Sequence, residues 1–367
     1  MNLLIAVCLL SGAVVSVTAT ALLRRLAPAW GLVDKPNARK VHTVPTALGG
    51  GIGIWLGIVL PLAAMELAVW WLSDPAAAPS WLPVSIVKNL AGVRARSGQL
   101  WGIVLGGSVI SALGLIDDLR NLRWQPKLLV QLLVACGLVT AGVRATVFSS
   151  QPWVGWCLSV LWIVILTNAF NFLDNMDALS GGIGLIASVV FAIVMLTGTS
   201  EPRWFVAGML LILAGSLGGF LVHNWPPAKI FMGDAGSCLV GLLLASLTMV
   251  GTFYDVGGTG RHVILAPLCV LAVPLYDFCS VVLIRLSQGR SPFHADKCHF
   301  SHRLVEMGLT RVQAVLTIHL VTLTTGLGGL LLYQVRTWTG AFLVVGLIVC
   351  VLAVIAILEW AGRGKES

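Results

Sequence analysis

The chain has 367 residues, of which 57% are hydrophobic and 10% are charged, and its mean hydropathy is +0.94. Soluble globular proteins carry roughly 25% charged residues, so this composition argues against a soluble enzyme and excludes an intrinsically disordered chain. Lys and Arg number 23 against 15 Asp and Glu. In a membrane protein such an excess marks loops beside anionic lipid, and we expect no nucleic-acid partner.

Eleven apolar runs predict an all-α, polytopic membrane protein, because about 20 apolar residues span a bilayer. The first run is followed by Arg24 and Arg25, whereas a signal peptide carries its positive charge before the apolar stretch. We therefore predict a retained first helix with its N-terminus outside. The expected helices cover about residues 2–23, 47–72, 100–116, 127–145, 153–170, 180–198, 204–222, 236–252, 263–285, 313–333 and 338–358.

The distribution of positive charge supports this orientation. With Arg285 counted at a cytoplasmic helix end, the predicted cytoplasmic segments carry 16 of the 23 Lys and Arg, as the positive-inside rule requires. We expect residues 1–367 to form a single transmembrane domain with a cytoplasmic C-terminus. The cytoplasmic loops are about 24–46, 117–127, 171–179, 223–235 and 286–312.

Aspartates gather on this predicted cytoplasmic face. Any one carboxylate at a helix end can be a solvated cap, but five in three clusters indicate a function. Paired carboxylates with few cations nearby favour a hard metal such as Mg²⁺, with Mn²⁺ as a substitute, held partly by substrate phosphates. Zinc is the alternative because His294, His299 and His302 share one loop, but Cys298 is the only nearby thiol. The five aspartates are Asp117, Asp118, Asp174, Asp177 and Asp234.

Three cytoplasmic helix starts are rich in glycine, at residues 48–51, 180–182 and 233–237. Helix N-termini offer unpaired N–H groups to phosphate, but small residues also allow helices to pack closely in membranes. Packing is the better interpretation of each motif alone. Taken together with Lys40, Lys127 and Lys229, the three starts also suggest a pyrophosphate site.

Five motifs follow one another over residues 34–310. They are Asp34–His42 followed by Pro45-Thr46, Gly114–Asp118 with Pro126-Lys127 and Gln131, Asn168-x-x-Asn171-x-x-Asp174-x-x-Asp177, Phe231–Ser237, and Asp296-x-x-His299-x-x-His302-Arg303-Leu304. In this order they resemble the motifs of the polyprenyl-phosphate N-acetylhexosamine-1-phosphate transferases. The resemblance covers most of the chain.

This resemblance implies transfer of N-acetylglucosamine-1-phosphate, or a related N-acetylhexosamine-1-phosphate, from a UDP-sugar to polyprenyl phosphate, with release of UMP. The reaction would be the first membrane step of cell-envelope glycan synthesis. The family also implies a Mg²⁺-dependent site, built by the cytoplasmic loops, at the bacterial inner membrane. It leaves a homodimer open.

The same resemblance suggests roles for individual residues. Asp234 and Asp118 would hold the metal, and Asp117 is the candidate base. Phe231 would stack on uracil or, alternatively, anchor the membrane interface; the histidines would contact substrate or only tie their loop together. Asp277 is left unassigned, because it could line the cleft or pair with Arg285. The expected catalytic residues are Asp117, Asp118, Asp174, His299 and His302, and the expected substrate-binding residues are Lys40, His42, Lys127, Asn168, Asn171, Asp177, Phe231 and Arg303.

Two other functions stay open. The spaced histidines of the last loop resemble the N-acetylglucosamine-1-phosphate branch, whereas a muramoyl-pentapeptide transferase would carry a compact histidine run. Asn175 and Ala178 stand where the family usually has glycine, and Ser301 where it often has histidine, which affects the sugar more than the reaction. A secondary transporter would explain the helices, but its acidic residues would lie near mid-bilayer rather than on one face.

Overall fold

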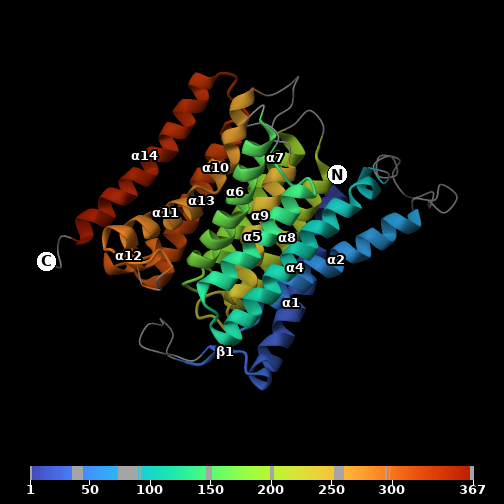
Figure 1. The fold of residues 1–367 in the computed structure, drawn as a ribbon, viewed down its shortest axis with the longest axis horizontal. Helices are drawn as coiled ribbons and strands as arrows, with labels where there is room; N and C mark the ends of the chain where they lie inside the picture. Colours follow the sequence, from blue (N-terminus) through green and yellow to red (C-terminus); the bar gives the residue numbers. More distant parts are fainter. Residues whose placement is uncertain are drawn as a thin grey trace.

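A computed structural model describes residues 2–34, 44–72, 90, 92–145, 151–198, 202–251, 260–293, 296 and 298–363. Within these ranges the protein is an elongated helical bundle, with α1 and α2 on one flank and α14 on the other (Figure 1). The helices are α1 (Asn2–Leu26), α2 (Gly50–Leu72), α4 (Ser97–Arg120), α5 (Trp124–Thr140), α6 (Pro152–Leu173), α7 (Leu179–Thr197), α8 (Trp204–Asn224), α9 (Gly233–Val250), α10 (Ala266–Val270), α11 (Ala272–Ser287), α12 (Phe300–Glu306), α13 (Arg311–Leu331) and α14 (Trp338–Arg363).

Each predicted apolar run coincides with helix, which confirms the all-α, polytopic fold. In the described part of the chain, nine helices are long and apolar enough to cross a membrane, and a bent pair makes up to ten. The helix α5, with 17 residues, is slightly shorter than these. The protein is therefore a multi-pass membrane protein. We had expected eleven spans, and α5 supplies the eleventh apolar helix.

The run expected at 263–285 is not one straight helix. It divides into a short 3₁₀ helix η2 (Arg261–Leu265), α10 and α11, with a bend of 64° at Leu271. Pro274 in the first turn of α11 has no N–H to donate to a carbonyl of α10, which explains why the helix breaks here. The bend changes the direction of α11, which then packs against α6.

Short elements outside the apolar runs were not predicted. A 3₁₀ turn η1 (Ala27–Trp30) leads from α1 to the strand β1 (Val33–Asp34), which pairs antiparallel with β2 (Thr46–Ala47). This ribbon lies at the end of the bundle opposite the N-terminus (Figure 1). At the same end α13 begins with a capping box between Thr310 and Gln313, which satisfies two free backbone N–H groups.

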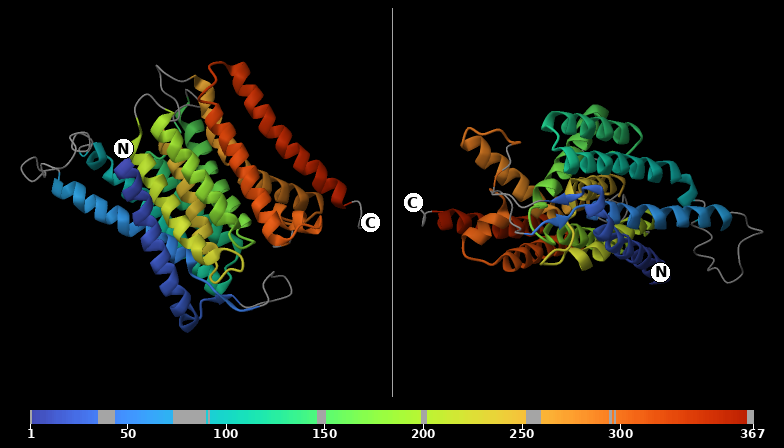
Figure 2. Two further views of the ribbon diagram at one scale, coloured as in Figure 1. Left: turned by 180° about the vertical axis from the view of Figure 1, so that it is seen from behind. Right: turned by 90° about the horizontal axis from the view of Figure 1, so that it is seen from below.

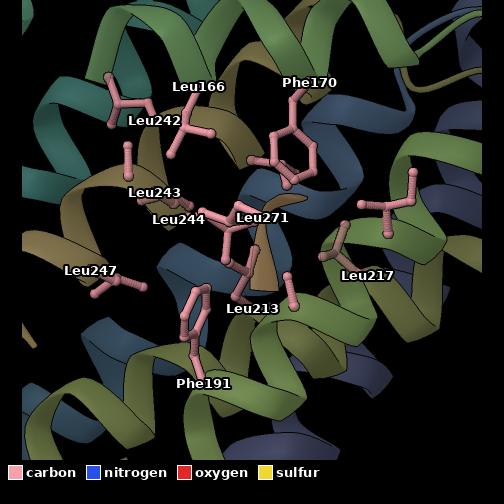
Figure 3. Packing of buried hydrophobic residues seen from close by; sticks show 14 of the residues in the cluster. Leu166, Phe170, Phe191, Leu213, Leu217, Leu242, Leu243, Leu244, Leu247 and Leu271 are labelled. Carbon is pink, nitrogen blue, oxygen red and sulfur yellow. The ribbon is translucent and has the colours of Figure 1, made fainter. Parts of the chain in front are cut away.

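The core lies between α6, α7, α8 and α9. Figure 3 shows Leu166 and Phe170 of α6 facing Leu213 of α8 and Leu244 of α9, with Leu271 among them. These side chains are buried.

By contrast, most of α14 is exposed, and Figure 2 shows it standing apart from the central helices. Its outward-facing apolar side chains suit contact with lipid, where only helices with satisfied backbones are stable.

Glycines allow α8 to approach α1 at backbone distance. A Cβ atom at Gly215 would lie 2.0 Å from the Leu9 carbonyl oxygen, and one at Gly219 would lie 2.4 Å from that of Ala13. Gly218, on the same helix, has no heavy atom within 4 Å of the equivalent position. Close packing through small residues therefore fixes α1 against the core.

We predict that Gly215→Ala lowers the thermal stability of the protein in detergent, because the added methyl group overlaps backbone that cannot move aside. Overpacking of this kind costs about 1–3 kcal/mol. The matched variant Gly218→Ala should be neutral or slightly stabilising, since alanine is the better helix former. Thermal unfolding of both purified variants tests this, and equal melting temperatures would contradict it.

Candidate active site

A cavity of about 770 Å³ opens at the end of the bundle that carries β1 and β2. Residues from all five loops that were predicted to be cytoplasmic line it. They include Asp34, Asp117, Asp118, Asn121, Asp174, Asn175, Asp177, Asn224, Phe231, Asp234, Asp296, His299, His302 and Arg311. The fold thus brings residues that are far apart in the sequence to a single polar cavity.

A lysine joins two of the acidic motifs. Lys127, near the start of α5, places its Nζ 2.5 Å from Oδ2 of Asp117 and 3.3 Å from Oδ2 of Asp234. The backbone N–H of Leu122 donates to the other oxygen of Asp117. Asn171 donates its side-chain amide to Oδ1 of Asp234 at 2.8 Å. Motifs from α4, α5, α6 and α9 therefore meet around one ammonium group.

Asp118 caps the first turn of α9. Its Oδ1 accepts the N–H of Asp234 at 3.0 Å, and its Oδ2 lies 3.4 Å from the N–H of Ala235. Gly233 makes this approach possible: its φ is +69°, and a Cβ atom there would lie 2.5 Å from Oδ2 of Asp118. A carboxylate at a helix N-terminus is stabilised by the free N–H groups and by the helix dipole.

Two of the three glycine-rich helix starts, those of α2 and α9, serve packing. The first two N–H groups of α2, those of Gly50 and Gly51, donate to the carbonyls of Phe231 and Met232. A Cβ atom at Gly51 would lie 2.3 Å from the backbone nitrogen of Gly236. Because Asp118 already occupies the N-terminus of α9, neither helix start offers a free phosphate nest. This geometry argues against the pyrophosphate interpretation of these glycines.

The turn between α6 and α7 places two further aspartates in the cavity. Burial raises the pKa of Asp174 well above its usual value, and the nearby Asp234 and Asp118 charges raise it further. Asp177 accepts the N–H of Ala228 at 2.9 Å. Ala178 has a φ of +63°, the left-handed conformation that explains why glycine is usual there. The turn is held by Asn224, which accepts the N–H of Ala178 at 2.8 Å.

The last loop enters the cavity through α12. His299 precedes this helix, and its Nδ1 lies 3.0 Å from Oδ2 of the buried Asp277. The ring of His302 lies 6.3 Å from that of His299, centroid to centroid. Asp296 pairs with Arg285 through two nitrogens at 3.1 Å each. Although burial raises the pKa of the Asp296 carboxyl, its hydrogen bonds with Arg285 lower it on balance.

The structure places most of the predicted site residues at this cavity, but not all. Lys127 and Asn171 are not among the lining residues, but both contact Asp234, which is. Asn168 instead donates to Gln131 at 2.7 Å and so connects α6 with α5. Arg303 is buried beside α14, with its Nε 3.1 Å from Oε1 of Glu359. Lys40 and His42 lie outside the described residues.

Arg303 and Asn168 therefore do not line the cavity in which substrate-binding residues were expected. The guanidinium of Arg303 also donates to the carbonyl of Cys298 and to Ser280. These contacts pair the buried charge of Arg303 with Glu359 and tie α12 to α11 and α14. Sequence order could not reveal them, because Glu359 is far away in the chain.

The lining includes residues that were not predicted, such as Asn121 and Asn224, and two charged residues at the site were also missed. Arg311 lines the cavity from the first turn of α13; the capping-box pattern Thr310-x-x-Gln313 could have placed this helix start. Asp277 was left unassigned, and Arg285 had been considered as its partner. Arg285 pairs with Asp296 instead, and Asp277 pairs with His299.

The oxygen-rich lining is compatible with a hard cation such as Mg²⁺. Within the described ranges, no three His, Cys, Asp or Glu side chains converge closely enough to hold a metal ion by themselves. Mg²⁺ is commonly held by only one or two carboxylates together with substrate phosphates. For zinc, which favours nitrogen and sulfur ligands, His299 has one ring nitrogen already committed to Asp277.

Comparison with known proteins agrees with the arrangement of these motifs. Residues 100–252 match the model of glycosyl transferase family 4. The chain is 30% identical over 339 residues to a probable undecaprenyl-phosphate N-acetylglucosaminyl 1-phosphate transferase of Bacillus subtilis, covering 90% of this chain and 85% of that protein. It is 35% identical over 334 residues to the decaprenyl-phosphate N-acetylglucosaminephosphotransferase of Mycobacterium leprae, covering 85% and 79%.

A more distant relative is the undecaprenyl-phosphate alpha-N-acetylglucosaminyl 1-phosphate transferase of Escherichia coli. It is 27% identical over 312 residues, which cover 81% of this chain and 75% of that protein. The similarity to all three relatives extends well beyond the segment that the family model matches. The chain therefore belongs to the family of polyprenyl-phosphate N-acetylglucosamine-1-phosphate transferases.

Proposed function

We propose that the protein transfers N-acetylglucosamine-1-phosphate from UDP-N-acetylglucosamine to a polyprenyl phosphate and releases UMP. The observation that carries this proposal is the meeting of Asp117, Asp118, Asp174 and Asp234 in one cavity, with Lys127 joining Asp117 to Asp234. The names of the relatives support the same acceptor and sugar. A secondary transporter is disfavoured, since these relatives are named as transferases.

The proposed reaction balances without a general base. An oxygen of the lipid phosphate attacks the β-phosphorus of the donor, a new P–O bond forms, and the bond to the α-phosphate breaks, so that its electrons leave with UMP. A phosphate monoester has a second pKa of about 6, so the acceptor is largely a dianion at neutral pH. The total charge is then the same before and after transfer, and no proton has to move.

The arrangement around Asp117 supports positioning rather than base catalysis. Both of its oxygens already accept hydrogen bonds, from Lys127 and from Leu122. In the proposed site Asp117 directs Lys127 toward Asp234, and the lysine can bind a phosphate oxygen as a point charge. Asn171 fixes the other side of the Asp234 carboxylate. Phosphoryl transfer depends chiefly on such positioning and electrostatics.

The charge of the cluster supports a divalent cation. Two anionic substrates would have to approach a cavity whose described lining has seven aspartates and one arginine, with Lys127 beside it, which is unfavourable without further positive charge. Asp234 and Asp118 would hold Mg²⁺, with Mn²⁺ as a substitute, and Asp174 lies beside them. When bound, the metal would neutralise the pyrophosphate charge that develops at the leaving UMP. Asp177 and Phe231 remain the proposed uracil-binding residues.

The site would lie on the cytoplasmic face of a bacterial inner membrane, because UDP-sugars are made in the cytoplasm. In this orientation α1 begins outside and α14 ends inside. A homodimer is a further expectation of the family.

We predict that EDTA abolishes UMP release and that Mg²⁺ or Mn²⁺ restores it, because the carboxylate cluster repels the substrates without a metal. Asp234→Asn should lower turnover at least about a hundredfold, the amount lost with one strong electrostatic stabiliser. Glu306→Gln is the matched control, an exposed acid of α12 outside the cavity lining. Full activity in EDTA would rule out the metal.

We predict that UDP-N-acetylglucosamine is used at least about tenfold better than the muramoyl-pentapeptide nucleotide. The spaced histidines of the last loop and the names of the relatives both favour the smaller sugar. The measurement is UMP release from each nucleotide with the same polyprenyl phosphate. Preference for the peptide-bearing donor would instead identify the muramoyl-pentapeptide branch.

We predict opposite sidedness for two engineered cysteines. Ser291→Cys, after α11, should react with an impermeant maleimide only when the cytoplasmic side is opened. Thr337→Cys, before α14, should react from outside. Both positions are exposed, and the background should lack the eight native cysteines. Labelling of both from the same side would contradict the proposed topology.

A further inference from the structure

A buried carboxylate holds the histidine of the last loop. Asp277 lies on α11 and is fully buried, with 0% of its surface exposed. Its Oδ1 accepts the backbone N–H of Phe300 at 2.6 Å, and its Oδ2 lies 3.0 Å from Nδ1 of His299. A buried carboxylate costs free energy unless its oxygens are hydrogen-bonded, and here each oxygen has a partner.

We propose that Asp277 is a positioning residue that fixes the tautomer of His299. An ionised carboxylate only accepts hydrogen bonds, so Nδ1 of His299 must carry the proton that it donates to Oδ2. A neutral ring protonated at Nδ1 has an unprotonated Nε2. His299 therefore presents a hydrogen-bond acceptor to the cavity that it lines.

The ring of His299 is also fixed from a second side. Phe172 at the end of α6 contacts it edge to face, with the centroids 5.7 Å apart. The guanidinium of Arg285 lies 5.0 Å from the centre of the Phe172 ring and pairs with Asp296. These contacts hold the ring plane, as required for a group that acts through one defined nitrogen.

An Nε2 acceptor selects the part of the substrate that it can bind. It pairs with an O–H or N–H donor and not with a phosphate oxygen. In the proposed reaction the donor nucleotide carries such groups on its N-acetylhexosamine, as hydroxyls and an acetamide N–H, and also on its ribose and its uracil. Asp177 and Phe231 are the residues proposed above for the uracil. Resting on the proposed function, the inference thus assigns His299 to a hydroxyl or N–H group on the sugars of the donor and not to a phosphate oxygen, and Asp277 keeps Nε2 of His299 a hydrogen-bond acceptor.

The variant Asp277→Asn should exchange the donor and acceptor nitrogens of the His299 ring while preserving the shape of the side chain at position 277. The N–H of Phe300 requires an acceptor, so the amide oxygen of Asn should take the place of Oδ1. Its NH₂ group then faces Nδ1 of His299, which must become the acceptor. The proton of the neutral ring moves to Nε2, and the cavity meets a donor where it had an acceptor.

The test is ¹⁵N NMR of histidine-labelled protein at pH 8, which distinguishes the two neutral tautomers. The chain has seven histidines, and His299→Gln identifies the signals of His299 by their loss. We expect a ring protonated at Nδ1 in the wild type and at Nε2 in Asp277→Asn. Turnover should fall about ten- to a thousandfold, as for a misdirected polar group, with the KM for polyprenyl phosphate unchanged.

Glu359→Gln is the matched control. Glu359 accepts the Tyr276 hydroxyl at 2.7 Å and pairs with Arg303 on the other side of α12. Losing this acid should lower thermal stability without moving the His299 proton. If Asp277→Asn likewise lowers only the stability and leaves the tautomer unchanged, Asp277 is merely structural and the proposal is overturned.

The wild-type spectrum alone is decisive if Asp277→Asn does not fold. A wild-type ring protonated at Nε2, or at both nitrogens, overturns the proposal. The tautomer is read without substrate, so a protein that shows the expected tautomers but releases no UMP would refute the proposed transferase function and leave the role of Asp277 intact.

Discussion

The approach of the Asp118 carboxylate to the first turn of α9 is the contact on which the rest of the cavity depends. It joins the end of α4 to a helix start more than a hundred residues later in the chain. Because the N–H groups of α9 are satisfied by this carboxylate, Asp234 is held with its side chain beside Lys127 and Asn171. Gly233 is required here for steric reasons, since a side chain would occupy the place of the Asp118 oxygen.

This arrangement concentrates negative charge at one end of an otherwise apolar bundle. The anionic wall is balanced locally by Lys127, while Arg285 and Arg303 are committed to Asp296 and Glu359. These two arginines are thus already paired in the fold. Within the described residues, the cavity combines hydrogen-bonded carboxylates with a loop whose His299 contacts Asp277 of α11.

The helices could be predicted because the bilayer imposes a length and an apolar composition on every spanning segment. The gathering of the acidic motifs at one end followed from counting helices between loops. The positions of Arg303 and Asn168 could not be predicted, because their partners Glu359 and Gln131 are set by helix packing rather than by local spacing. The bend at Leu271 was missed for a different reason: hydropathy alone does not register the lost hydrogen bond of Pro274.

The burial of Asp277 has a consequence for how the protein is made. An aspartate near the centre of a spanning helix opposes insertion from the translocon by about 2.5–3.5 kcal/mol. Its partners His299 and the N–H of Phe300 lie 22 and 23 residues later in the chain, so they are synthesised after it. The carboxylate of Asp277 can therefore be satisfied only once α11 and the start of α12 have come together. The side chain that orients the histidine thereby makes the late steps of assembly depend on one another.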